Sequence, residues 1–251
     1  MRRASSATDA LQTCEREWHL LQSYISYHDI RVQHGVDDIA ANMRRLCETI
    51  IQDEAQAPPH ALGTCSAYLV ENNILNDLVS LCLPDEPPGM HDERLRSCTA
   101  LVRHIHVPWF LANECVAHAL LQLLRSCNKK QQKPPGLVEL VYALCARVHQ
   151  QPDTLRVLVQ LGAQLPKERP ADRFPLMTCI VGHITMDGPF GRHMRTSLVW
   201  FMHALLTLGT NHRAAWPALY FDQATCSDLA QSLNEAVAHA FNHCLLYPSP
   251  S

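Results

Sequence analysis

The chain has 251 residues, of which 47% are hydrophobic, enough to bury the core of one large domain or two modest ones. Its formal net charge is −3, which gives no electrostatic footprint for non-specific nucleic-acid binding, a function that requires clustered Lys and Arg. The 9 glycines are about half of average usage, and Leu, Ala, Gln and Glu recur at helical spacing, so the composition predicts an all-α protein.

The N-terminal sequence does not fit a secretory signal. Arg2 and Arg3 are followed by Ser, Ala, Thr and Asp rather than by an apolar stretch. No run approaches the roughly 18 to 20 apolar residues that a transmembrane helix needs. Eleven cysteines without a secretion signal indicate a reducing compartment, where buried cysteine behaves as a small hydrophobic side chain. We therefore expect free thiols in a cytoplasmic protein.

The first third of the chain is predicted to form helices separated by short breaks. A frayed leader over 1–9 precedes a helix from Leu11 to Tyr27. A second helix carries one apolar stripe from Val36 to Ile50, with Asp37 or Asp38 as its N-cap. After Pro58-Pro59, a helix from Thr64 to Glu71 is followed by Asn72-Asn73 and more apolar turns, which form either one kinked helix or two short helices.

Proline begins most of the later helices. The predicted segments are a helix from Pro87-Pro88-Gly89 through His106, one opening at Pro108 with Cys115 in its wide apolar stripe, one from Pro134-Pro135-Gly136, and one between Pro152 and Gly162. Further helices are predicted over Phe174–Met186, Arg192–Leu208 and Thr225–Cys244.

These segments predict stacked antiparallel helical hairpins in an armadillo- or HEAT-like α-solenoid. The expected regions are a disordered leader at 1–9, a helical repeat region at 10–162, a polar Pro-containing loop at 163–173, a continuation at 174–246 and a disordered tail at 247–251. The two Pro-Pro-Gly starts lie 47 residues apart, as do Cys98 and Cys145, and armadillo and HEAT repeats have periods of about 40 to 47 residues. Chance recurrence in a Pro-rich helical protein is the alternative.

Histidine and cysteine abundance raises the question of a metal site. No Cys-x-x-Cys pair occurs, and a structural zinc site needs four converging ligands. Cys115 and His118 share a helical face but lack a second pair. His239 and His243 are expected on a solvated face, and His104 and His106 point in different directions. We therefore predict no metal or other cofactor.

The motifs of phosphate, acyl-transfer and zinc-protease chemistry are absent. There is no Gly-rich phosphate loop, Gly-x-Ser-x-Gly or His-Glu-x-x-His. We assign no catalytic residue and predict that the protein is not an enzyme.

A series of blocks resembles the FTS and Hook-interacting protein family, also called retinoic-acid-induced 16-like. The blocks, which together cover about residues 15–244, are Trp18-His19 with Tyr24 and Tyr27, Cys65-Ser-Ala-Tyr-Leu-Val-Glu-Asn-Asn-Ile-Leu75, Pro87-Pro-Gly-Met90, Val138 to Pro152, Phe174 to Leu208, and Cys226 to Phe241. Ala67 stands where the family pattern has Glu. Family members are several times longer, so we expect an N-terminal portion or a truncated chain.

The resemblance implies a scaffold that joins FTS, an inactive ubiquitin-conjugating-like protein, to Hook coiled-coil adaptors. It also implies a link between Rab-marked vesicles and dynein-dynactin, with peripheral localisation on endosomes or other vesicles and no transmembrane segment. Such a role needs a helical surface with a few large anchors. The candidate protein-binding residues are Trp18, Tyr24, Trp109, Trp200 and Trp216, although a Trp at helical spacing is more often a core residue.

Two other classes of function remain open from the residues alone. One is a general armadillo-like peptide-binding module without a link to transport, which would present a ladder of Asn or basic residues. The other is a zinc- or thiol-dependent enzyme, which only the His and Cys content suggests.

Overall fold

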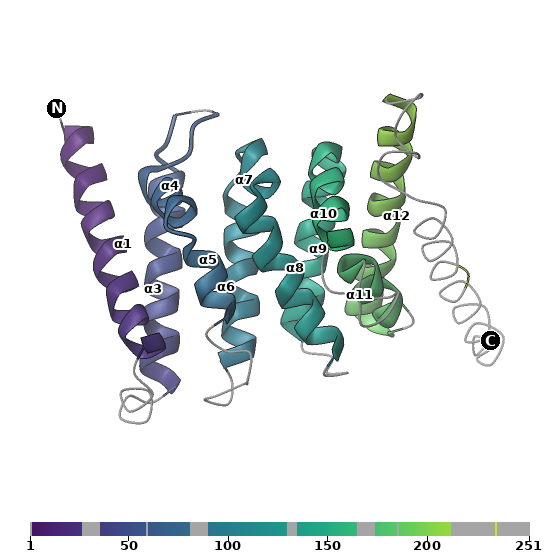
Figure 1. Cartoon of the computed structure of the whole chain (residues 1–251), viewed down its shortest axis with the longest axis horizontal. Helices are drawn as coiled ribbons and strands as arrows, with labels where there is room; N and C mark the ends of the chain where they lie inside the picture. The colour runs from purple at the N-terminus through teal and green to yellow at the C-terminus, as the bar shows by residue number, and fades with distance from the viewer. Residues whose placement is uncertain are drawn as a thin grey trace. The chain divides into compact units, whose positions relative to one another are not determined.

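The computed structural model describes residues 2–26, 36–58, 60–80, 90–129, 135–164, 174–184, 186–211 and 234. Every regular element in this part of the chain is an α-helix, which confirms the predicted all-α class for these residues (Figure 1). The helices are α1 Arg2–Ser26, α3 Val36–Glu54, α4 Thr64–Glu71, α5 Ile74–Ser80, α6 Met90–His104, α7 Pro108–Ala112, α8 Glu114–Lys129, α9 Pro135–Gln150, α10 Pro152–Gln164, α11 Pro175–His183 and α12 Gly188–Asn211.

The chain divides into two compact units, Met1–Leu120 and Leu121–Ser251. The boundary between the units falls within α8. The polar loop predicted over 163–173 is described only in part. Residues 163 and 164 of that loop end α10, and the remainder lies outside the described residues. The helix predicted over Thr225–Cys244 and the tail at 247–251 also lie outside them, apart from residue 234.

In the first unit, α3 packs between α1 and α6. Contacts from Asn42 to Tyr24 and from Arg45 to Glu17 show that α1 and α3 are antiparallel, because the residue numbers rise in one helix as they fall in the other. Contacts from Arg44 to Glu93 and from Cys47 to Ser97 show that α3 and α6 are parallel. The helix α4 packs on both α1 and α3, and α5 packs on α4.

In the second unit, α12 packs mainly on α9, and α10 and α11 contact both of these helices. Tyr142 contacts His193 and His149 contacts His203, so α9 and α12 are parallel. The thiol of Cys145 also forms a hydrogen bond with Ser197 across this pair. Both units therefore contain parallel neighbouring helices joined by a buried contact between a cysteine thiol and a serine hydroxyl.

Burial keeps several thiols protonated. Burial raises the pKa of Cys47 to about 12 and that of Cys145 to about 12, although a hydrogen bond with a serine, Ser97 and Ser197 respectively, opposes the shift. The hydrogen bond to Cys14, together with burial, raises the pKa of Cys65. All the described cysteines are free thiols, in agreement with the expectation for these residues.

The N-terminus of α4 is capped by side chains from α3. The N–H group of Cys65 donates to Oδ2 of Asp53 at 2.7 Å, and the N–H group of Gly63 donates to Oε2 of Glu54 at 2.9 Å. The hydroxyl of Ser66 donates to the same Glu54 oxygen at 2.6 Å. Carboxylates are stabilising at a helix N-terminus, where backbone N–H groups lack partners. The C-terminal turn of α3 therefore fixes the start of α4.

Asparagines determine two of the helix breaks. Asn73 has a φ of 53°, a left-handed conformation that asparagine tolerates better than most residues, and the segment there forms two short helices, α4 and α5. Asn113 separates α7 from α8, and its Oδ1 accepts hydrogen bonds from the N–H groups of Cys115 and Val116. The single helix predicted from Pro108 is therefore wrong, because Asn113 starts a new helix.

Three local predictions are corrected. Cys115 is exposed and not in an apolar stripe, because it lies in the first turn of α8, after the break. The helix α1 begins at Arg2, so residues 2–9 of the expected leader are helical. Because α3 begins at Val36, Asp37 and Asp38 lie inside its first turn and not at the N-cap. Both carboxylates still interact favourably with the positive end of the helix dipole.

Candidate protein-binding surfaces

The predicted anchors occupy different environments. Trp18 is only 4% exposed and Tyr24 is buried, with its hydroxyl accepting a hydrogen bond from Asn42 at 3.2 Å, so both belong to the core. Trp109 on α7 is 47% exposed. Trp200 on α12 is partly exposed, and Trp216 lies outside the described residues. Only Trp109 and Trp200 are therefore accessible to a partner among the candidates that the structure describes.

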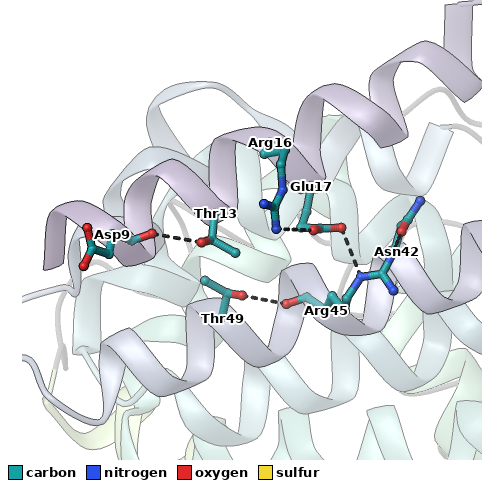
Figure 2. Close-up of polar contacts among 7 residues, drawn as sticks. All are labelled: Asp9, Thr13, Arg16, Glu17, Asn42, Arg45 and Thr49. Atoms are coloured by element: carbon teal, nitrogen blue, oxygen red, sulfur yellow. Dashed lines mark hydrogen bonds and ion pairs between the residues drawn. The ribbon is translucent and has the colours of Figure 1, made fainter. Parts of the chain in front are cut away.

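The first surface is an arginine row made by Arg16, Arg44, Arg45 and Arg96. On α1, the buried carboxylate of Glu17 lies between two guanidinium groups, with Arg16 Nη2 at 3.1 Å from Oε1 and Arg45 Nε at 3.2 Å from Oε2 (Figure 2). Arg45 also donates to Oδ1 of Asn42. Figure 2 shows that the carboxylate points from α1 toward Arg45 on α3.

A matching arrangement joins α3 to α6. The buried carboxylate of Glu93 accepts a hydrogen bond from Arg44 Nη1 at 3.3 Å and forms an ion pair with Arg96 Nη1 at 3.6 Å, both through Oε2. The adjacent residues Arg44 and Arg45 thus reach in opposite directions to the two neighbouring helices. A buried carboxylate needs paired charge and hydrogen bonds to offset its desolvation, and the arginines supply both.

The second surface is an aromatic and histidine stripe on α9 and α12. It consists of Tyr142, His149, His193, Trp200 and His203. The ring centroids are 4.4 Å apart for Tyr142 and His193 and 5.0 Å apart for Tyr142 and Trp200, and His149 stacks on Trp200 at 5.9 Å. Intervals of three or seven residues place these side chains on one face of each helix.

Apolar side chains extend this stripe into solvent. Val199 and Leu206 on α12 are each about two thirds exposed, and they lie one residue from Trp200 and three residues from His203 respectively. Trp and Tyr rings combine large apolar area with a polar group, which makes them frequent anchors at interfaces. This part of α12 therefore has the composition of a protein-binding surface.

The histidines do not assemble a metal centre among the described residues. No group of three or more His, Cys, Asp or Glu side chains there is arranged to hold an ion. His193 Nδ1 lies 3.8 Å from Oε1 of Glu139, and His149 meets His203 edge to face at 4.7 Å. His104 and His106 are exposed near the end of α6, whereas His239 and His243 lie outside the described residues.

An apolar cavity in the second unit is too small for a metabolite. Its volume is about 10 Å³, and typical ligand pockets measure about 300 Å³ or more. Its lining is entirely apolar and includes Leu155, Leu158, Phe174, Met177 and Phe201. It offers no polar group that would orient a substrate.

The arginine row was not predicted from the sequence. In the sequence, Arg44 and Arg45 fall on the polar side of the helix predicted from Val36, and Glu17 and Glu93 carry no signal because their burial depends on packing between helices. The available signal was the Arg44-Arg45 pair, since adjacent residues on a helix diverge by about 100° and can contact two neighbours. Trp200 was predicted, but its partners Tyr142, His149 and His193 were not.

No described helix is long and apolar enough to cross a membrane.

Residues 65–237, more than two thirds of the chain, match the model of a protein family described as retinoic acid induced 16-like protein. The matched segment contains all of α5 to α12 and excludes α1 and α3. No solved structure is significantly similar to the chain.

Proposed function

Because the chain belongs to the retinoic acid induced 16-like family, we propose that it is a non-enzymatic scaffold that joins transport proteins on vesicles. The family match over residues 65–237 is the observation that carries this proposal. The resemblance recognised from sequence blocks over about 15–244 is thereby confirmed for the matched segment. It implies an adaptor that connects Rab-marked vesicles or endosomes to dynein-dynactin through a Hook coiled-coil protein and FTS.

The proposed architecture is an armadillo- or HEAT-like solenoid, with helical regions at 10–162 and 174–246. Two observations support it. The pairs α3/α6 and α9/α12 are both parallel, as equivalent helices of successive hairpins are in such a stack. A thiol–hydroxyl contact joins the helices of each pair, Cys47–Ser97 in the first and Cys145–Ser197 in the second.

The proposed contact region for a transport partner is the stripe on α9 and α12. It lies within the matched segment, it has two aromatic anchors in Tyr142 and Trp200, and Val199 and Leu206 add exposed apolar area. Fully packed aromatic side chains dominate the affinity of most protein interfaces. Trp109 on α7 is a further accessible anchor in this proposal.

The test is reconstitution with purified components from the same source. The chain is immobilised and exposed to the C-terminal segment of Hook, to FTS and to GTP-loaded Rab proteins, alone and together. Binding of Hook or FTS with a dissociation constant in the micromolar range or below supports the adaptor role. Binding of neither protein, by a chain whose circular dichroism is helical, overturns it.

A matched pair of variants locates the contact. Val199→Asp places a charge on the exposed part of α12, and Arg192→Gln changes an exposed residue of the same helix without adding a buried charge. The first variant should weaken Hook or FTS binding at least tenfold, because an interface does not accommodate an unpaired buried charge. The second should leave it within a factor of two. Equal effects would place the contact elsewhere.

A further inference from the structure

The arginine row has more positive charge than its buried carboxylates need. Four guanidinium groups accompany Glu17 and Glu93, which leaves a net charge of +2 on these six residues. One guanidinium neutralises one carboxylate. The outer members, Arg16 and Arg96, are 67% and 69% exposed at their side chains, and each contributes a single nitrogen to the described ion pairs.

The ion pairs hold the guanidinium groups of Arg16 and Arg96 in place and involve only one nitrogen of each. A guanidinium has five N–H groups in a rigid fork that matches a carboxylate. Arg16 and Arg96 each contact a carboxylate that is itself fixed by a second arginine on α3, Arg45 for Glu17 and Arg44 for Glu93. Less side-chain entropy is therefore lost when a partner binds them than with freely rotating arginines.

We propose that the arginine row docks an acidic segment of a partner protein. The row crosses α1, α3 and α6, and neighbouring helix axes are about 8–10 Å apart, so it spans about 20 Å. An extended peptide covers that distance with about six residues. Acidic side chains at alternate positions of such a segment would face the successive guanidinium groups.

Negative charges near the arginine row favour an acidic peptide over a uniformly charged polyanion. Glu48 is exposed one turn beyond Arg44 and Arg45 on α3, and Asp92 is exposed one turn before Arg96 on α6. These carboxylates repel a continuous anionic surface such as a membrane or a nucleic acid. A peptide avoids them by carrying its acidic residues only opposite the arginines.

The arginine row is independent of the proposed transport role. The row is built from α1, α3 and α6, and Arg16, Arg44 and Arg45 precede the matched segment 65–237. A chain that bound neither Hook, FTS nor Rab would still present it.

The test is fluorescence anisotropy of the full chain with a labelled 12-residue peptide of alternating Glu and Ser. The double variant Arg16→Gln/Arg96→Gln removes the outer guanidinium groups and leaves each buried carboxylate paired with an arginine of α3. We expect it to weaken peptide binding about fivefold or more, with affinity that falls as salt is raised. Arg192→Gln in the other unit is the matched control and should change affinity less than twofold.

Two further measurements keep the proposal falsifiable. Arg16→Lys/Arg96→Lys should recover only part of the affinity, because an ammonium group cannot bind a carboxylate through a planar fork. A peptide with Gln in place of every Glu should not bind. The proposal is overturned if the double Gln variant binds the acidic peptide as tightly as the parent chain. Equal or tighter binding of phosphatidylserine vesicles or of duplex DNA through the same arginines also overturns it.

Discussion

Replacing Gly63 with alanine should destabilise the first unit through a steric conflict with α3. A Cβ atom at this position would lie 2.6 Å from Oδ2 of Asp53, 3.0 Å from the backbone nitrogen of Glu54 and 3.1 Å from its Cα. The backbone of Gly63, with φ −60° and ψ 157°, is open to any residue, so conformational strain is not involved. The close approach of α3 is the sole reason that this position favours glycine.

The cost of Gly63→Ala follows from what has to move. Displacing Asp53 breaks its hydrogen bond to the N–H group of Cys65, a buried contact whose loss costs about 1–3 kcal/mol. Shifting the Glu54 backbone by a few tenths of an ångström adds about 1 kcal/mol. Alanine recovers about 0.4–1 kcal/mol by restricting the unfolded chain. The net loss is about 2 kcal/mol, which lowers the melting temperature of a unit of this size by about 6–10 °C.

Urea unfolding followed by circular dichroism and tryptophan fluorescence measures the change, with Trp18 as the buried reporter in the same unit. The control is Gly182→Ala in α11, where a new Cβ meets nothing within 4 Å, so the higher helix propensity of alanine should stabilise by up to about 1 kcal/mol. We expect Gly63→Ala to lower the free energy of unfolding and Gly182→Ala to raise it. A Gly63→Ala chain as stable as the parent would refute the close approach of Gly63 to α3.

Three other predictions follow from burial. Trp18→Ala should cost about 3–5 kcal/mol, whereas Trp109→Ala should cost less than 1 kcal/mol, as measured by the same urea titration; similar costs would mean that Trp18 is not a core residue. In native protein at pH 8, iodoacetamide should label Cys115 much faster than Cys47 or Cys145, whose thiols have a pKa of about 12, and mass spectrometry of peptides would show equal rates if the burial were wrong. Burial raises the pKa of Asp77 above its usual value, so this carboxyl favours the fold when protonated and that contribution is lost as the pH rises through the folded-state pKa. Asp77→Asn should therefore flatten the loss of stability from pH 4 to pH 7, and an unchanged pH profile would contradict the shift.

The sequence predicted helices well where apolar spacing and helix-breaking residues agreed. The interval from Thr64 to Glu71 was predicted with both ends correct, because Asn72-Asn73 follows it directly. Asn113 was missed as a break because the apolar pattern continues across it, and this error misplaced Cys115. Helix ends depend on caps that are weak signals in a sequence.

The candidate surfaces were harder to predict, because exposure depends on which helices are neighbours. Trp18 and Trp109 look alike as residues in helices, yet α3 and α4 pack on the helix of the first, whereas the second lies exposed on the short helix α7. The arginine row depends on two helix interfaces meeting at Arg44-Arg45, and no periodicity encodes that. Packing between helices that are distant in the sequence therefore determines which candidate binding residues are exposed, whereas local sequence patterns determine where the helices form.

The carboxylates that cap α4 also bear on the order in which the chain folds. Asp53 and Glu54 lie at the C-terminal end of α3, where negative charge opposes the helix dipole, so α3 alone should fray there. The helix α4 has only eight residues, too few for stability in isolation. Each helix therefore gains its missing stabilisation only when the other docks. During synthesis, the end of α3 should become ordered only after the residues through Glu71 have emerged, which makes α3 and α4 one cooperative folding step.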